Sequence, residues 1–213
     1  MRIFPLGDSA ATIEFGNEIS VGLNNRSITL ADHLIRDPFN GMIEAVPAYA
    51  SVTVYYDPTK TTFSSVEQNL MNVAQDLRVE ANSDTRLIEI PLEISIETSP
   101  DLDRIVELSG IAESDAVELF LSNTYRVYML GFLPGFAYMG EVDDRIAAPR
   151  LETPRTRVPR GSVGIAGKQT GIYPLESPGG WNIIGRTDLK MFDPTSNSPC
   201  FLRPGDEVRF VRC

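Results

Sequence analysis

The chain has 213 residues, 42% of them hydrophobic, and a formal net charge of −10, which suits one large or two small globular domains. This acidic balance argues against a nucleic-acid partner. No apolar run approaches the length of a membrane span, and the N-terminus lacks the apolar segment of a secretory leader, so we expect no membrane partner and a cytoplasmic location. One histidine, His33, and two cysteines cannot make a common four-ligand zinc site, and we predict no metal.

Residues 1–85 are predicted to form a small α/β domain. Alternating apolar and polar residues predict strands, and apolar residues at helical spacing predict helices. In chain order these are a strand at 11–15, a helix at 18–36, strands at 42–46 and 51–56, a helix at 64–77 and a strand at 86–90. This βαββαβ order is that of a ferredoxin-like unit. Ser64 to Glu67 fit a capping box that would begin the second helix at Ser64, and 82–84 are expected to be a loop.

Residues 86–213 are predicted to form a second domain, a β-barrel, with the boundary between 84 and 92. Short strands separated by glycine and proline turns are typical of barrels and sandwiches. A helix is expected at 100–108, capped by Gly110, and a second at 113–121. Strands are expected at 125–130, 163–166, 182–185, 189–192 and 207–211. The predicted fold class is therefore α+β.

The stretch from Gly131 to Thr187 carries ten of the 16 glycines and six of the 15 prolines. Such density predicts shaped loops on a β scaffold. Six basic and two acidic residues lie between 149 and 187, although the chain as a whole is acidic. This basic, glycine-lined region indicates an anionic ligand or an acidic partner. The alternative is that the arginines only solvate the loops.

Three arginines of this stretch, Arg150, Arg155 and Arg157, alternate with prolines that hold the segment extended. Their guanidinium groups could be aimed at a carboxylate or phosphate, or could form a salt-bridged loop against the acidic first domain. The segment 161–169 invites a comparison with a phosphate-binding loop. It fails, because Ser162 stands where the first glycine should be and Gln169 where the magnesium ligand should be.

Aromatic residues and glycines alternate around Phe136 and Trp181, which predicts either stacked core packing or a pocket wall. Trp181 follows Gly179 and Gly180, and core packing is the better expectation for it. The hydroxyl of Tyr173 could donate a hydrogen bond to a substrate carbonyl.

Four motifs in this region resemble the KipI / allophanate hydrolase subunit 1 family. They are G-F-L-P-G-F-A-Y-M-G at 131–140, P-R-L-E-T-P-R-T-R-V-P at 149–159, G-S-V-G-I-A-G-K-Q-T-G-I-Y-P at 161–174 and S-P-G-G-W-N-I-I-G-R-T at 177–187. Shorter motifs at 5–10, 46–51, 56–58 and 204–210 extend the resemblance over nearly the whole chain. It implies a cyclophilin-like barrel in the second domain.

The resemblance also implies a function. The chain would act as the B-type subunit of an ATP-dependent 5-oxoprolinase, which opens 5-oxoproline to glutamate. Its partners would be a KipA-type (PxpC-type) subunit and a PxpA-type protein, and the complex would use ATP at a site outside this chain. The alternatives are an inhibitor of a sensor histidine kinase, as described for KipI, and a subunit of an allophanate- or urea-related amidohydrolase.

Two features depart from the resembled family. Relatives carry a glycine-rich segment after Pro91, where this chain reads L-E-I-S-I-E-T-S-P-D-L and keeps only Pro100-Asp101-Leu102. Phe120 stands where relatives tend to have a histidine. If these features belong to the site, the departures favour a regulatory role.

Side-chain chemistry then selects candidates within the glycine-rich stretch. Tyr173, Gln169 and Lys168 are the candidate catalytic groups. The arginines are expected to hold a substrate carboxylate or an acyl phosphate, while backbone amides of the Gly179-Gly180 turn polarise an amide carbonyl. The candidate substrate-binding residues are Arg150, Arg155, Arg157, Arg186, Gly135, Phe136, Thr170, Gly179, Gly180, Trp181 and Thr187.

Overall fold

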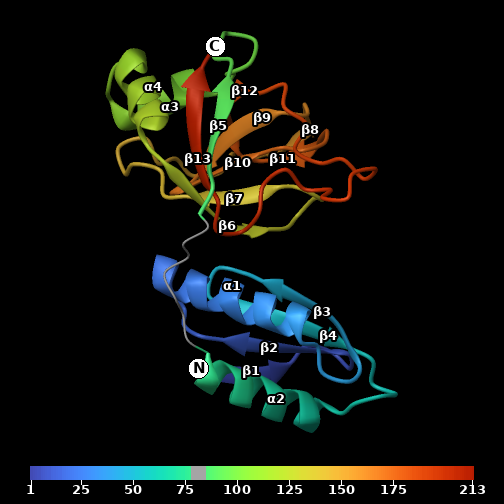
Figure 1. Ribbon diagram of the computed structural model, residues 1–213. Coiled ribbons are helices and arrows are strands. Elements are labelled where there is room, and N and C mark those ends of the chain that lie inside the picture. The colour runs from blue at the N-terminus through green and yellow to red at the C-terminus, as the bar shows by residue number, and fades with distance from the viewer. Residues whose placement is uncertain (78–84) are drawn as a thin grey trace. The chain divides into compact units, whose positions relative to one another are not determined.

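A computed structural model describes residues 1–77 and 85–213 of the chain. The contacts divide the chain into two compact units, Met1–Asp84 and Thr85–Cys213 (Figure 1). Each unit encloses its own hydrophobic core. No helix among the described residues is both long and apolar enough to cross a membrane. The loop predicted at 82–84 lies outside the described residues.

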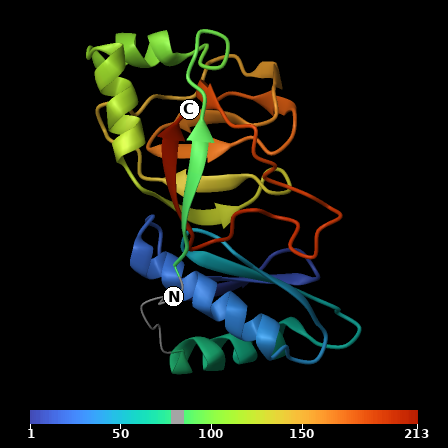
Figure 2. The same ribbon diagram turned by 45° about the horizontal axis from the view of Figure 1, so that its top comes forward.

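The first unit is a four-stranded antiparallel sheet covered by two helices. The strands lie in the order β1 (Arg2–Pro5), β2 (Ala10–Glu14), β4 (Ser51–Tyr56) and β3 (Met42–Pro47). The helices α1 (Val21–Arg36) and α2 (Phe63–Asp76) pack on the same face of the sheet, as Figure 2 shows. Alternate strand residues such as Ile13 and Val52 point into this core and are fully buried. The period-two alternation in the sequence therefore becomes one buried face.

The predicted ferredoxin-like order is not confirmed, because the fourth strand of this sheet is β1 and not residues 86–90. Those residues form β5 (Leu87–Leu92), which pairs in the second unit. The observed order of the first unit is ββαββα. β1 is a short edge strand of four residues that ends in Pro5, so its sequence carries little strand signal.

The predicted start of the second helix was wrong. Thr62 is the N-cap of α2, and its hydroxyl accepts a hydrogen bond from the amide of Ser65 at 3.3 Å. Ser64 already lies in the first helical turn. The sequence offers a hydroxyl at both positions, and only the extended backbone of Thr62 suits an N-cap.

The second unit is built on a seven-stranded sheet that closes almost completely into a barrel. Glu93, just after β5, forms an isolated bridge with Arg186, and their two backbone hydrogen bonds measure 2.8 and 2.9 Å. All neighbouring strands are antiparallel except the parallel pair β13 and β5. The strand order is β12 (Asn182–Arg186), β9 (Ser162–Ala166), β10 (Gln169–Ile172), β7 (Ala137–Gly140), β6 (Tyr125–Leu130), β13 (Glu207–Arg212) and β5.

Two short helices, α3 (Leu102–Ser109) and α4 (Glu113–Ser122), lie together at one side of this sheet (Figure 1). α3 ends at Gly110, whose φ of 70° is the left-handed conformation expected for a C-terminal cap. α4 contributes Phe120 to the core, where its ring lies 5.1 Å from that of Phe210. Phe120 is 2% exposed, so this departure from the resembled family fills the core and does not face solvent.

The predicted strand at 189–192 is wrong. The amide of Leu189 donates to the hydroxyl of Thr187, and the carbonyl of Met191 accepts from the amide of Phe201. The segment therefore makes loop contacts in place of a strand ladder. Four strands of this unit were not predicted: β7, β10, β11 (Ser177–Gly179) and β8 (Arg155–Val158). Glycine or proline interrupts the alternation in the first three, whereas β8 lies between two prolines and was expected only as an extended segment. β8 and β11 pair as a separate two-stranded sheet.

Candidate functional site

The glycine-rich stretch folds into the strands β7 to β12 around a small aromatic core of its own. The ring of Phe136 lies 4.9 to 5.4 Å from those of Tyr138, Tyr173 and Trp181, in edge-to-face geometry. Phe136, Tyr173 and Trp181 are at most 5% exposed. Of the two expectations for these aromatics, the structure therefore supports core packing over a pocket wall.

Tyr173 is buried in this core and does not present its hydroxyl to solvent. A Cβ at Gly179 would overlap the Tyr173 hydroxyl oxygen, so the glycine allows the strand to pass over the phenol. Burial raises the pKa of Tyr173, although a backbone hydrogen bond from Trp181 partly opposes this shift. The hydroxyl is thus a neutral packing group at physiological pH.

Other predicted residues serve the scaffold in a similar way. The buried hydroxyl of Thr170 donates to the carbonyl of Gly164 at 3.0 Å, and that of Thr187 accepts from the amide of Leu189 at 3.3 Å. Gly135 has a φ of 81°, and a Cβ at this position would lie only 2.9 Å from the Met191 carbonyl oxygen. These residues shape the loops, and the two hydroxyls are already engaged.

Lys168 and Gln169 lie in a tight hairpin between β9 and β10. Ala166 pairs with Gln169, so Gly167 and Lys168 form the turn, and the following residues are strand. The Lys168 ammonium lies 2.5 Å from a carboxylate oxygen of Asp144 at the exposed surface. This geometry is not that of a phosphate-binding loop, which needs a helix after the glycine-rich turn.

Among the described arginines of 131–187, Arg155 is the one whose ion-pair partner is buried. Its Nη2 lies 2.6 Å from Oδ1 of Asp101, whose side chain is only 7% exposed. The other oxygen of Asp101, Oδ2, accepts the backbone amide of Ile183 at 2.7 Å. The Nη1 atom of Arg155 is buried and has no hydrogen-bond partner among the described residues. A buried donor without a partner is rare in native proteins.

The remaining arginines are more exposed. Arg157 pairs with Glu176 at 2.7 Å, and both side chains are largely in solvent. Arg150 is exposed and close enough to Tyr138 and Tyr173 to lower the pKa of both, against the larger opposing effect of burial. The turn predicted at Gly179-Gly180 is wrong, because Gly179 is the last residue of β11 and pairs with Arg155 of β8. The Gly179 end of β11 therefore adjoins Arg155.

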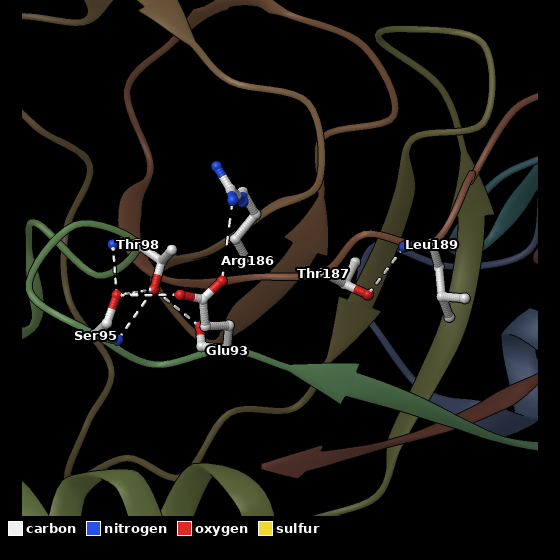
Figure 3. Close-up of polar contacts among 6 residues, drawn as sticks. All are labelled: Glu93, Ser95, Thr98, Arg186, Thr187 and Leu189. Atoms are coloured by element: carbon white, nitrogen blue, oxygen red, sulfur yellow. Dashed lines mark hydrogen bonds and ion pairs between the residues drawn. The ribbon is translucent and has the colours of Figure 1, made fainter. Parts of the chain in front are cut away.

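Arg186 faces the polar turn at 93–98, where the resemblance had led us to expect a glycine-rich segment. Figure 3 shows this turn, in which the hydroxyls of Ser95 and Thr98 lie 3.0 Å apart and Thr98 donates to the carbonyl of Glu93 at 3.1 Å. The Glu93 carboxylate lies 3.9 Å from Nη2 of Arg186, a loose ion pair. The charge of Arg186 is thus partly balanced within the chain.

Asp101 is a candidate functional residue that the sequence analysis missed, because its candidates were all chosen from 131–187. It lies outside that stretch, immediately before α3, and reaches Arg155 only through the fold. A sequence signal existed in Pro100-Asp101-Leu102, the residues that the resemblance marks as shared with the family. Within residues 1–77 and 85–213, no three histidine, cysteine, aspartate or glutamate side chains are grouped to hold a metal ion.

Comparison with known proteins places these features in context. The family model described as carboxyltransferase domain, subdomain C and D, matches residues 1–202. The chain is 41% identical to the B-type subunit of the 5-oxoprolinase of Bacillus subtilis, covering 99% of this chain and 92% of that protein. It is 38% identical to the B-type subunit of the 5-oxoprolinase of Escherichia coli O157:H7, covering 99% and 95%.

Among solved structures, the crystal structure of TTHA0988 superposes with a TM-score of 0.85 at 38% identity. The match covers 96% of this chain and 40% of TTHA0988, so the present chain corresponds to less than half of that longer protein.

Proposed function

Because the chain belongs to the family described as carboxyltransferase domain, subdomain C and D, we propose that it is the B-type subunit of a 5-oxoprolinase. The observation that carries this proposal is the similarity to proteins of that name along almost their entire length. A likeness of fold alone would not specify an activity. The product would be glutamate, formed by opening the cyclic amide of 5-oxoproline.

The geometry supports a role in holding the substrate. 5-Oxoproline carries a carboxylate, and a guanidinium group recognises a carboxylate through charge-assisted hydrogen bonds. The Arg155 side chain is 32% exposed and carries a buried Nη1 that has no partner among the described residues, and Arg150 adds positive charge from the surface. The backbone amides of Gly179 and Gly180, next to Arg155, would polarise the lactam carbonyl as charge develops on its oxygen.

ATP would be used by the complex and bound outside this chain. The hairpin at 166–169 lacks the amide-lined helix start that holds phosphates, so no step of the reaction is assigned to ATP on these residues. We propose that a KipA-type subunit completes the site and that a PxpA-type protein is the third component. The nearly closed sheet is compatible with the cyclophilin-like barrel that the family resemblance implies.

Co-expression with the two partner proteins tests this function. The expected result is a complex that co-purifies and releases glutamate from 5-oxoproline only when ATP is present. The chain alone should show no turnover, since the site is shared. A stable complex with no activity on 5-oxoproline would contradict the proposal, and full turnover by the isolated chain would contradict the shared site.

A further inference from the structure

We propose that Asp101 is a positioning residue that aims Arg155 at the carboxylate of the substrate. This inference rests on the proposed function for the identity of the substrate. It concerns a residue outside the glycine-rich stretch, and it assigns separate tasks to the two terminal nitrogens of one guanidinium group.

Asp101 is fixed from several directions. Its amide donates to the carbonyl of Ile183 at 3.0 Å, and its Oδ2 accepts the amide of Ile183 at 2.7 Å. The residue is therefore tied to β12 by both its backbone and its side chain. The first turn of α3 adds a further contact, because Arg104 donates to the side-chain carbonyl of Asn182 at 3.0 Å. The carboxylate is thus a rigid reference point in the second unit.

The Asp101 carboxylate fixes the orientation of the Arg155 guanidinium group. Nη2 of Arg155 donates a hydrogen bond to Oδ1 of Asp101 at 2.6 Å. Because the guanidinium group is planar and rigid, this bond also restricts the direction in which Nη1 points. Nη1 is buried and has no partner within the described part of the chain. Native proteins seldom leave such a donor unpaired, and a ligand oxygen is one group that satisfies it.

The chemistry of the site selects a carboxylate as that ligand group. Arg155 and Asp101 together are close to neutral, so the pair itself offers directed hydrogen bonding more than net charge. The exposed Arg150, near the same aromatic core, supplies positive charge. A near-neutral pair beside one exposed arginine suits a small ligand with a single negative charge. The carboxylate of 5-oxoproline carries one such charge.

Equilibrium binding to the assembled complex, measured by titration calorimetry, tests the inference. Asp101→Asn keeps the size of the side chain but can no longer accept both the Arg155 and the Ile183 hydrogen bonds. We expect it to weaken 5-oxoproline binding at least tenfold. The matched control is Asp103→Asn, which makes the same charge change two residues away on the exposed surface of α3 and should leave binding unchanged.

A double-variant cycle separates positioning from a purely structural role. In the Arg155→Ala background, Asp101→Asn should change the affinity less than twofold, because the group that it positions is absent. A further readout is 2-pyrrolidinone, the lactam without the carboxylate, whose weaker binding should be equal in the wild type and in Asp101→Asn. Trp181 fluorescence during urea unfolding checks that each variant is folded, and Arg155→Met, which keeps the aliphatic stem without a donor, replaces Arg155→Ala if the latter is not.

The outcomes distinguish this inference from the proposed function. An equal loss from Asp101→Asn in both backgrounds, or a matching loss of 2-pyrrolidinone binding, would overturn positioning even if the complex turns over 5-oxoproline. A cycle with the expected coupling in a complex that binds 5-oxoproline but never hydrolyses it would support positioning and reject the proposed activity. A wild-type complex that does not bind 5-oxoproline would overturn both.

Discussion

Arg155 and Arg157 lie two residues apart in β8, yet their surroundings differ. Arg155 pairs with the buried carboxylate of Asp101, which also accepts a backbone amide of β12. Arg157 pairs with Glu176 at the surface, where the two side chains are 74% and 49% exposed. Exposed ion pairs of the second kind contribute about 0–1 kcal/mol to stability. The two arginines look equivalent in the sequence, and the difference arises from Asp101, 54 residues away along the chain.

Tyr173→Phe tests whether the phenol takes part in chemistry. Because the hydroxyl lies inside the aromatic core, we expect turnover of the assembled enzyme to be unchanged. Loss of a donor to a reacting oxygen would instead lower kcat by about 10²- to 10³-fold. The variant should lose about 1–3 kcal/mol of unfolding free energy, because the buried backbone amide of Trp181 that donates to this hydroxyl is left unpaired. Steady-state kinetics and urea unfolding give the two values, and a large fall in kcat at unchanged stability would return Tyr173 to the catalytic candidates.

At the level of elements, close backbone approach depends on a few glycines. Gly161 has a φ of 82°, and a Cβ there would overlap the carbonyl oxygen of Thr187. Gly161→Ala should lower the unfolding free energy by about 3 kcal/mol or more, from left-handed backbone strain and overpacking together. Gly167→Ala is the matched control, because its φ is 59° with open space at the Cβ position, and it should cost only about 1–2 kcal/mol. Equal losses in Trp181-monitored urea unfolding would contradict this account.

Elements with strong local patterns were predictable from sequence. Helical spacing located α1 and α4, and Gly110 marked the end of α3. The strands β7, β10 and β11 were not found, since glycines and prolines that serve tertiary packing erase the alternation on which strand prediction depends. β8 was expected only as an extended segment, because prolines lie on both sides of it. Strand pairing was equally hidden, because nothing local shows that 87–92 joins β13 and not the first sheet.

The sequence indicated the stretch that holds the candidate site, but not which of its side chains are accessible. The density of glycine, proline and arginine selected 131–187, and the structure brings Arg155 and the Gly179 end of β11 together there. Burial could not be read from the same residues. The Tyr173 hydroxyl is buried, and the hydroxyls of Thr170 and Thr187 already form hydrogen bonds to the backbone.

At the scale of the molecule, buried tyrosines predict a loss of stability in alkali. Burial is the main cause that raises the pKa of Tyr125, Tyr128, Tyr138 and Tyr173, all in the second unit. The unfolded chain releases these protons near the ordinary tyrosine pKa of about 10, while the folded chain retains them. Above that pH the folded state binds more protons, so the free energy of unfolding falls as pH rises, and below it this contribution is fully present.

Tyr125→Phe tests this explanation. The Tyr125 hydroxyl donates to the carbonyl of Phe120 at 2.8 Å, so its removal should cost about 1–3 kcal/mol at neutral pH by leaving a buried acceptor unpaired. The same variant should show a shallower decline in stability above pH 10 than the wild type. Tyr55→Phe, at an exposed ring, should not change that decline. Urea unfolding followed by Trp181 fluorescence from about pH 7 to 11 measures both effects, and parallel declines for all three proteins would exclude Tyr125 as a cause.

The most direct test of the central claim, that Arg155 holds the substrate carboxylate of a 5-oxoprolinase, is kcat/KM for 5-oxoproline in the assembled enzyme with Arg155→Ala. Loss of a charge-assisted hydrogen bond should lower this value about 10- to 100-fold. Arg160→Ala, at an exposed arginine five residues further on, is the matched control and should retain wild-type activity. An unchanged kcat/KM for Arg155→Ala, or an equal fall in both variants, would contradict the claim.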